Sequence, residues 1–197
     1  AASIDIGASG CMIKNIQLLP SVTDVLIAID CETLFTDHVL EDIEVLTGED
    51  GAGVDEFVAG IEMKIGITRA LIKGFLYDQH ASAVGVARGI YFNGASNRVR
   101  IKDFWIEIIG AAGVAGIEGT GSSLRSLIED GVIITDNEPG IELAAGQTGI
   151  IRDVLIFADL ATIAAATVAA GMAHDRVKYI ELGNESDAVV KTASIDD

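Results

Sequence analysis

The sequence predicts an all-β protein: a right-handed parallel β-helix (solenoid) of about six to seven coils with a small C-terminal capping segment. Two observations predict this fold. The chain of 197 residues contains 27 Ile and 16 Val against 14 Leu, an excess that favours strands over helices. Two short phrases also recur in step along most of the chain. We expect coils over residues 1–159 and an Ala-rich cap and tail over residues 160–197.

The longer phrase reads aliphatic, charged, Asn/Asp/Gly, apolar, any residue, apolar, and its copies start 23 to 32 residues apart. Apolar and polar residues alternate within it, as in a strand with one buried face. The Asn/Asp/Gly position suits a sharp bend, because these residues best tolerate a left-handed backbone. We expect the first residues of the six copies to form one interior column: Ile13, Leu40, Ile72, Ile101, Ile128 and Ile151.

The shorter phrase precedes each copy by about ten residues and is centred on isoleucine. No coil can bury its apolar face alone, so these isoleucines should stack between neighbouring coils. The expected second column is Ile4, Ile27, Ile61, Ile90, Ile117 and Ile141. Outward-facing acids should follow most of them, namely Asp5, Glu62, Glu118 and Glu142, with Ala28 and Tyr91 interrupting the series.

The competing fold is doubly wound α/β, which needs a helix of about ten or more residues between strands. Most connections here are shorter and rich in glycine. Residues 160–173 are the exception, because their alanines favour a helix while their Thr, Ile and Val residues oppose it. A solenoid needs an atypical terminal element over its open edge, so we interpret residues 160–197 as that cap.

The net charge of −17 comes from 30 acidic and 13 basic residues and is unevenly distributed. Residues 1–60 carry 12 acids and one base, whereas residues 61–130 carry 7 acids and 8 bases. A chain this acidic repels nucleic acid. No apolar run approaches the roughly 20 residues of a membrane span. We therefore expect neither nucleic acid nor a membrane as a partner.

One basic stripe stands out from this acidic background. Arg98, Arg100 and Lys102 alternate with two apolar residues and should share an outer face, and Arg88 lies nearby in sequence. These four residues are the candidate site for docking an acidic partner or a neighbouring subunit. The alternative is that they pair with carboxylates on adjacent coils, each exposed pair contributing about 0–1 kcal/mol.

No motif in the sequence indicates catalysis, cofactor binding or a metal centre. The histidines His38, His80 and His174 are far apart and lack the spacing of metal ligands. A glycan-cleaving β-helix stays open as an alternative, because outward acids on the first strands offer the carboxylate pair that glycoside hydrolysis requires. Aromatic residues, which stack on sugars, make up only 5% of the chain.

The coils over residues 3–157 resemble the right-handed parallel β-helix proteins of tailed-bacteriophage virions, namely tailspikes, fibres and head-surface spikes. The segment Pro139–Gly146, the Ala-rich stretch after it and the segment Asn184–Val190 are similar to the C-terminal region of β-helix proteins found among phage structural genes. This resemblance implies a homotrimer on the particle surface, in contact with other virion proteins such as the major capsid protein. The chain departs from depolymerising tailspikes because it is short and lacks a recognisable carboxylate cleft.

We therefore expect a non-enzymatic bacteriophage virion structural protein, a spike or decoration on the head surface, with no cofactor. The alternative is a glycan-binding or glycan-cleaving fragment similar to a tailspike. A third hypothesis is a secreted adhesin or lyase, which predicts a signal peptide removed upstream of Ala1.

Overall fold

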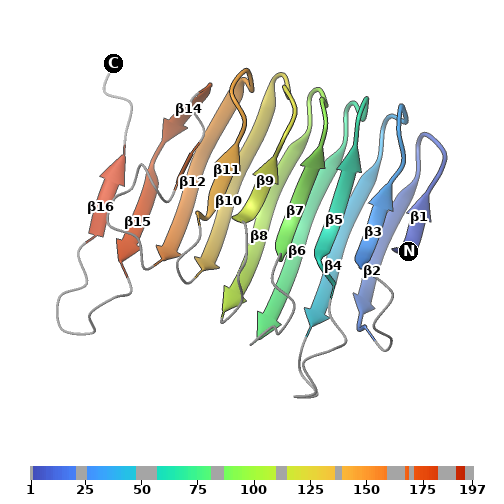
Figure 1. Cartoon of the computed structure of the whole chain (residues 1–197), viewed down its shortest axis with the longest axis horizontal. Coiled ribbons are helices and arrows are strands. Elements are labelled where there is room, and N and C mark those ends of the chain that lie inside the picture. The colour runs from blue at the N-terminus through green and yellow to red at the C-terminus, as the bar shows by residue number, and fades with distance from the viewer. Residues whose placement is uncertain are drawn as a thin grey trace.

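The computed structural model shows parallel strands stacked as a β-solenoid (Figure 1), which confirms the predicted parallel β-helix. It describes residues 2–20, 26–47, 57–80, 87–109, 115–135, 139–158, 167–168, 171–181 and 190–193. Over these residues the protein is all-β and has no helix, and so none that could span a membrane. The stack makes about five turns, slightly fewer than the six to seven coils predicted.

The first strand of each coil belongs to one parallel sheet, termed sheet A. Its strands alternate in sequence with those of the other sheet, so they carry odd numbers. In spatial order they are β1 (Ala2–Ile6), β3 (Ile27–Cys31), β5 (Ala59–Lys64), β7 (Arg88–Asn93), β9 (Ala115–Gly119), β11 (Ile141–Leu143) and β13 (Thr167–Val168).

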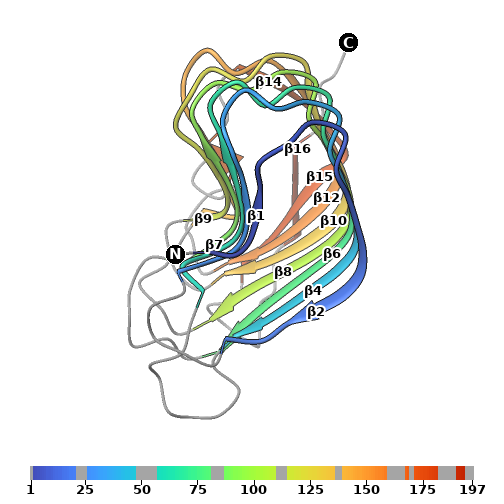
Figure 2. The same ribbon diagram turned by 90° about the vertical axis from the view of Figure 1, so that its right-hand side faces the viewer.

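The second sheet, termed sheet B, has longer strands and forms the opposite wall of the stack (Figure 2). Its strands are β2 (Met12–Leu18), β4 (Val39–Thr47), β6 (Leu71–His80), β8 (Arg100–Ile109), β10 (Ser126–Thr135), β12 (Gly149–Ala158), β15 (Val177–Glu181) and β16 (Val190–Ala193), with β14 (Met172–Asp175) also beside β12. The last strand, β16, pairs antiparallel with β15.

The predicted column in sheet B is confirmed. Its six members are partners in the strand register from Ile13 to Ile151. From Leu40 onward each is at most 1% exposed, whereas Ile13 in the end coil is only half-buried. The core therefore lies between the two sheets and runs the length of the stack.

The predicted bend is also confirmed. The Asn/Asp/Gly position of the six copies has a left-handed backbone, with φ between 52° and 64°. The residues are Asn15, Asp42, Gly74, Asp103, Asp130 and Asp153. Each strand of sheet B therefore turns sharply at this position without leaving the sheet.

The predicted column in sheet A is wrong at one position. Ile29, rather than Ile27, is the partner of Ile4 and of Ile61, and Ile27 instead pairs with Ala2 and Ala59. A slip of two residues leaves the same side chains facing inward, so alternation alone does not distinguish the two registers. The correction places Asp30, rather than Ala28, opposite Asp5 and Glu62.

The predicted cap falls partly on residues outside the described part of the chain, including 160–166 and 182–189. The described part of this segment continues the stack: β13 extends sheet A, and β15 and β16 extend sheet B. Residues 48–56, 81–86, 110–114 and 136–138, which contain much of the variable connections, also lie outside the described residues.

Candidate interaction face

A row of charged side chains, termed the charge row, runs along the outer face of sheet B. Each member directly follows, in sequence, an inward-facing residue of the strand and itself faces away from the core. In order along the stack the members are Lys14, Glu41, Lys73, Lys102, Glu129, Arg152 and Asp175. Opposite charges are neighbours at most steps, and such pairs stabilise a sheet.

Ion pairs connect the charge row across coils. Glu41 accepts hydrogen bonds from Lys14 and from Lys73, whose Nζ lies 3.0 Å from Oε1. These two lysines hold the pKa of Glu41 below its usual value. Glu129, which is 1% exposed, lies between Arg100 and Arg152 and accepts hydrogen bonds from both.

Burial of Glu129 would by itself raise the pKa of its carboxyl group. The hydrogen bonds from Arg152 and Arg100 outweigh that effect and hold the pKa below the ordinary value. The carboxylate is therefore ionised at neutral pH, and it links three successive coils at β8, β10 and β12. This buried, paired charge requires both arginines, because an unpaired buried charge is costly.

Arg100 and Lys102 alternate with buried residues as predicted, but Arg98 lies outside the strand and does not continue the stripe. Val99 and Ile101 are at most 1% exposed, while Arg98 and Arg100 are exposed and Lys102 is half-buried. Arg98 has a left-handed backbone and lies in the turn before β8. The backbone N–H of Arg98 donates a hydrogen bond to the carbonyl oxygen of Leu124 on the next coil, at 2.8 Å.

The four predicted docking residues do not form one patch. Arg88 lies on sheet A, where its guanidinium binds Glu118 and stands 4.5 Å from the centre of the Tyr91 ring. Arg100 pairs with the adjacent coil through Glu129. Lys102 is 3.6 Å from the carboxylate of its own neighbour, Asp103. Pairing with adjacent coils, the alternative weighed above, therefore describes Arg88 and Arg100.

Two further outward rows, termed the apolar rows, flank the charge row on sheet B. One row begins two residues before the charge row and comprises Met12, Val39, Leu71, Arg100, Leu127 and Ile150, and it ends at Ala173. The other lies three residues after it and comprises Gln17, Glu44, Leu76, Trp105, Val132, Leu155 and Lys178.

The apolar side chains of these rows are half-buried or exposed. Met12 is 62% exposed, and Trp105 and Ile150 are each 42% exposed. Contiguous exposed apolar patches mark interaction sites, and here the exposed Met12, Trp105 and Ile150 lie in rows with half-buried apolar neighbours. The charge row and the two apolar rows together form the candidate interaction face, termed the sheet B face.

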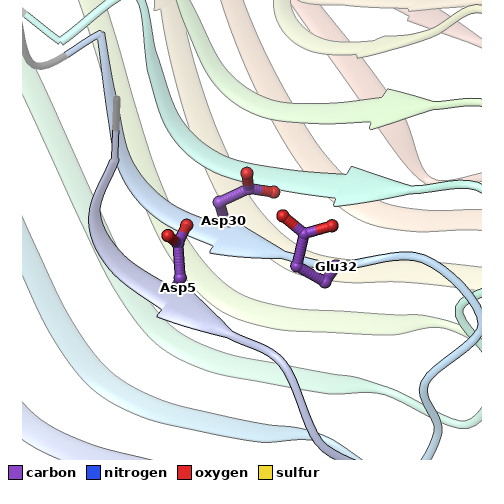
Figure 3. A group of neighbouring side chains, drawn as sticks. All are labelled: Asp5, Asp30 and Glu32. Carbon is purple, nitrogen blue, oxygen red and sulfur yellow. The ribbon is translucent and has the colours of Figure 1, made fainter.

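The outer face of sheet A is acidic instead. In the corrected register its outward residues are Asp5, Asp30, Glu62, Tyr91, Glu118 and Glu142. Near the N-terminal end, carboxylate oxygens of Asp5, Asp30 and Glu32 lie within 4.8 Å of one another (Figure 3). The ammonium of Lys64 lies 2.6 Å from Asp30 Oδ2 and 2.9 Å from Glu32 Oε1, so it neutralises part of this cluster.

Asp30 and Glu32 respond differently to the same lysine. Asp30 is 5% exposed, and burial raises the pKa of its carboxyl group more than the hydrogen bond from Lys64 lowers it. Glu32 is more exposed, so the hydrogen bond from Lys64 dominates and lowers the pKa of its carboxyl group.

A hollow of about 500 Å³ opens on sheet A beside the last acidic residues. It is lined by Glu118, Thr120, Glu142, Leu143 and Ala144, among others. Glu118 is held by Arg88 at one side of the hollow. The two glutamates are partners on adjacent strands, so their carboxylates approach the same space.

The apolar rows are the feature of the candidate face that sequence reasoning missed. The signal was present in the longer phrase, whose fifth position was treated as any residue. That position holds Leu76, Trp105, Val132 and Leu155 in four successive copies. The chain matches no family model, no curated protein and no solved structure, so the functional argument rests on these residues.

Proposed function

We propose that the protein is a non-enzymatic structural protein of a tailed-bacteriophage virion, a spike or decoration on the head surface. The sheet B face is the observation that carries this proposal. A face with apolar rows along the outside of a regular stack suits a protein whose work is attachment. The resemblance of the coils to virion β-helix proteins supports the phage particle as the place where the protein attaches.

Burial of the apolar rows supplies the affinity for attachment. Removing apolar surface from water contributes about 25 cal/mol per Å². Trp105 lies near the middle of the face, and tryptophan is enriched among the side chains that dominate binding energy. The charge row between the apolar rows fixes the register of the contact more than it adds affinity.

The distribution of charge supports a position on the outside of the particle. The net charge of −17 repels packaged nucleic acid and keeps free copies soluble before assembly. The acidic face of sheet A would then point to solvent, and the sheet B face toward the particle or a neighbouring copy.

Mass spectrometry of particles purified from the phage that encodes this chain tests the proposal. We expect the chain in a fixed ratio to the other structural proteins, with antibody label on the head in electron micrographs. Trp105→Glu should leave the chain in the soluble fraction of the lysate, because it places a charge in the face. The matched control Leu34→Glu changes a 76% exposed leucine in a turn and should still be incorporated. A wild-type chain found only in the soluble fraction contradicts the proposal.

The second candidate, a glycan-binding or glycan-cleaving fragment, is favoured by the hollow beside Glu118 and Glu142. Adjacent strands are about 4.8 Å apart, which is compatible with the roughly 5–5.5 Å between the carboxyl groups of retaining glycosidases. Incubation with the surface polysaccharide of the host discriminates the two. Shortened glycan chains that disappear with Glu142→Gln would establish the enzyme, whereas intact chains support the non-enzymatic proposal.

A further inference from the structure

We infer that Arg98 and Arg125, termed the arginine pair, and the hollow beside them form a binding site for a ligand that carries a phosphoryl group. Both arginines lie in the turns that lead from sheet A into sheet B (Figure 1). Their side chains are exposed, and neither forms an ion pair with the described part of the chain. The inference does not depend on the virion proposal, because it rests on these turns and not on the sheet B face.

The register of the coils brings the arginine pair side by side. The preceding residues, Asn97 and Leu124, are bridge partners on adjacent coils. Neighbouring parallel strands are about 4.8 Å apart, and both arginines have the same left-handed backbone, with φ of 55° and 58°. Their side chains therefore leave the turns in the same direction, and both guanidinium groups can reach one ligand.

Arginine is an unusual residue for the backbone of this turn. The same position is left-handed in five successive coils, at Gly10, Asp37, Arg69, Arg98 and Arg125. Gly and Asp tolerate this conformation, whereas most other residues lose about 1–2 kcal/mol in it. At the bends of sheet B, six successive copies of the longer phrase place Asn, Asp or Gly in the same conformation. The arginines therefore recur in the turn for their side chains rather than for their backbone.

Arg69 shows what an arginine at this position does when an acid lies beside it. Its guanidinium binds the Asp37 carboxylate of the preceding coil through two hydrogen bonds, Nε to Oδ1 at 2.6 Å and Nη2 to Oδ2 at 2.7 Å. The arginine pair has no such acid among the described residues, although the chain contains 30 acidic residues. Two uncompensated positive charges therefore lie next to each other, and like charges on neighbouring strands destabilise a sheet.

A hollow of about 360 Å³ opens beside Arg125, and its lining includes Ser126, Leu127, Thr148 and Ile150. Thr148 is exposed, and its hydroxyl oxygen accepts a hydrogen bond from the backbone N–H of Arg125 at 3.2 Å. Its hydroxyl hydrogen stays free to donate to a ligand. Ser126 is 4% exposed, and its hydroxyl group has no hydrogen-bond partner among the described residues. Two hydroxyl groups therefore lie next to the arginine pair.

A phosphoryl group matches these donors in charge and in number. It carries about −1.5 to −2 charges at neutral pH and three strong acceptor oxygens. The arginine pair carries two positive charges, and guanidinium groups bind phosphate through two parallel hydrogen bonds. A carboxylate carries a single charge and would leave one arginine uncompensated. The bound phosphoryl group would also remove the repulsion between the two arginines.

The surroundings of the site restrict the ligand to a compact phosphate monoester. The net charge of −17 repels a long polyanion such as a nucleic acid. The neighbouring arginines, Arg69 and Arg100, are already bound to acids of the chain. Leu127 and Ile150, which is 42% exposed, offer apolar contact to the organic part of the ester. The monoester is either a free small molecule or a phosphorylated residue of a partner protein.

An NMR titration of the protein with sodium phosphate at neutral pH tests the site. Sodium chloride is adjusted to hold the ionic strength constant, because salt screens exposed charges. We expect the Nε–H signals of Arg98 and Arg125 to shift along one saturation curve, while that of Arg69 stays in place. Glycerol phosphate and a phosphoserine peptide should give the same shifts. The tighter of these two ligands tells whether the ester is a free small molecule or part of a partner protein.

The variants Arg98→Asn and Arg125→Asn separate binding from folding. Asparagine tolerates the left-handed backbone, so each variant should unfold at a urea concentration no lower than that of wild type. Each should weaken the binding of glycerol phosphate about tenfold or more, because hydrogen bonds to a charged group are lost. The matched control removes the neutral pair of the preceding turns, with Arg69→Asn and Asp37→Asn combined, and should keep the wild-type affinity.

Three results would overturn the inference. They are a titration without shifts at the arginine pair, shifts of equal size at all arginines of the chain, and an affinity that both asparagine variants retain. Tighter binding of single-stranded DNA than of glycerol phosphate would also contradict it. None of these results bears on the virion proposal, which depends on incorporation of the chain into particles.

Discussion

At each bend of sheet B, a single residue holds a backbone conformation that most residues avoid. Aspartate occupies four of the seven bends, asparagine and glycine occupy one each, and Arg176, which pairs with Asp153, occupies the last. A left-handed conformation costs ordinary residues about 1–2 kcal/mol, and Asn, Asp and Gly least. The repeated choice of these residues therefore removes a penalty that would otherwise recur in every coil.

Asp130 tests this account of the bends. It is exposed and has φ of 56°. Asp130→Val should lower the free energy of unfolding by about 1–2 kcal/mol, because valine is strained in this conformation. Asp130→Asn should unfold at nearly the wild-type urea concentration. Equal losses for both variants would show that the carboxylate, rather than the backbone, matters there.

Asp30 tests the electrostatics of the acidic cluster through pH. Its pKa is raised in the folded protein above the ordinary 3.8, so folding favours its protonated form. Its ionisation therefore costs stability as pH rises through these two values, and the cost is complete above the folded pKa. We expect Asp30→Asn to be more stable than wild type in urea at pH 7, and the difference to vanish at pH 3.

Glu32 supplies the matched control with the opposite sign. Lys64 lowers the pKa of its carboxyl group, so its ionisation adds stability above the ordinary value of 4.5. Glu32→Gln should therefore be less stable than wild type at pH 7 and equal to it at low pH. If Asp30→Asn also loses stability at pH 7, the ion pair with Lys64 outweighs the burial of Asp30.

At the scale of elements, glycines allow the two sheets to approach each other. Gly60, Gly89, Gly116 and Gly140 precede the interior isoleucines of sheet A. A Cβ on Gly116 would lie 2.6 Å from Cγ2 of Ile133 on sheet B and 2.8 Å from the carbonyl oxygen of Gly140. These glycines explain why Gly-Ile recurs in the shorter phrase.

Gly116→Ala should therefore destabilise the fold. Overpacking a core typically costs about 1–3 kcal/mol, and here the added methyl group meets a backbone carbonyl that shifts only with its strand. Gly7→Ala is the control, because nothing lies within 4 Å of a Cβ at that position. Urea unfolding of both variants measures the difference. Equal stability would place the two sheets farther apart than described.

Sequence reasoning predicted the elements of sheet B better than those of sheet A. The bend residues fix the register of sheet B, because only one alignment brings Asp103 beside Asp130 and Asp130 beside Asp153. The segment Ile27–Ile29 carries no such marker, and its alternation fits two alignments. The apolar rows could not be predicted from the repeat, because burial between the sheets constrains its inward positions and leaves its outward positions free to vary.

At the scale of the whole molecule, the two sheets present different surfaces. Sheet A carries a column of acids on its outer side, and sheet B carries partly apolar rows beside a row of alternating charges. The acidic surface opposes random association, whereas the exposed apolar side chains make the sheet B face the one that we propose for attachment. The solenoid therefore presents one acidic face and one face with partly exposed apolar rows.

Fluorescence of Trp105 tests most directly whether the sheet B face is a contact surface. Trp105 is the sole tryptophan and is 42% exposed in one copy. When the protein is bound to purified phage heads, we expect emission at short wavelength and weak quenching by acrylamide, whereas the free protein should show the values of an exposed indole. Strong quenching that is the same with and without heads would contradict the account.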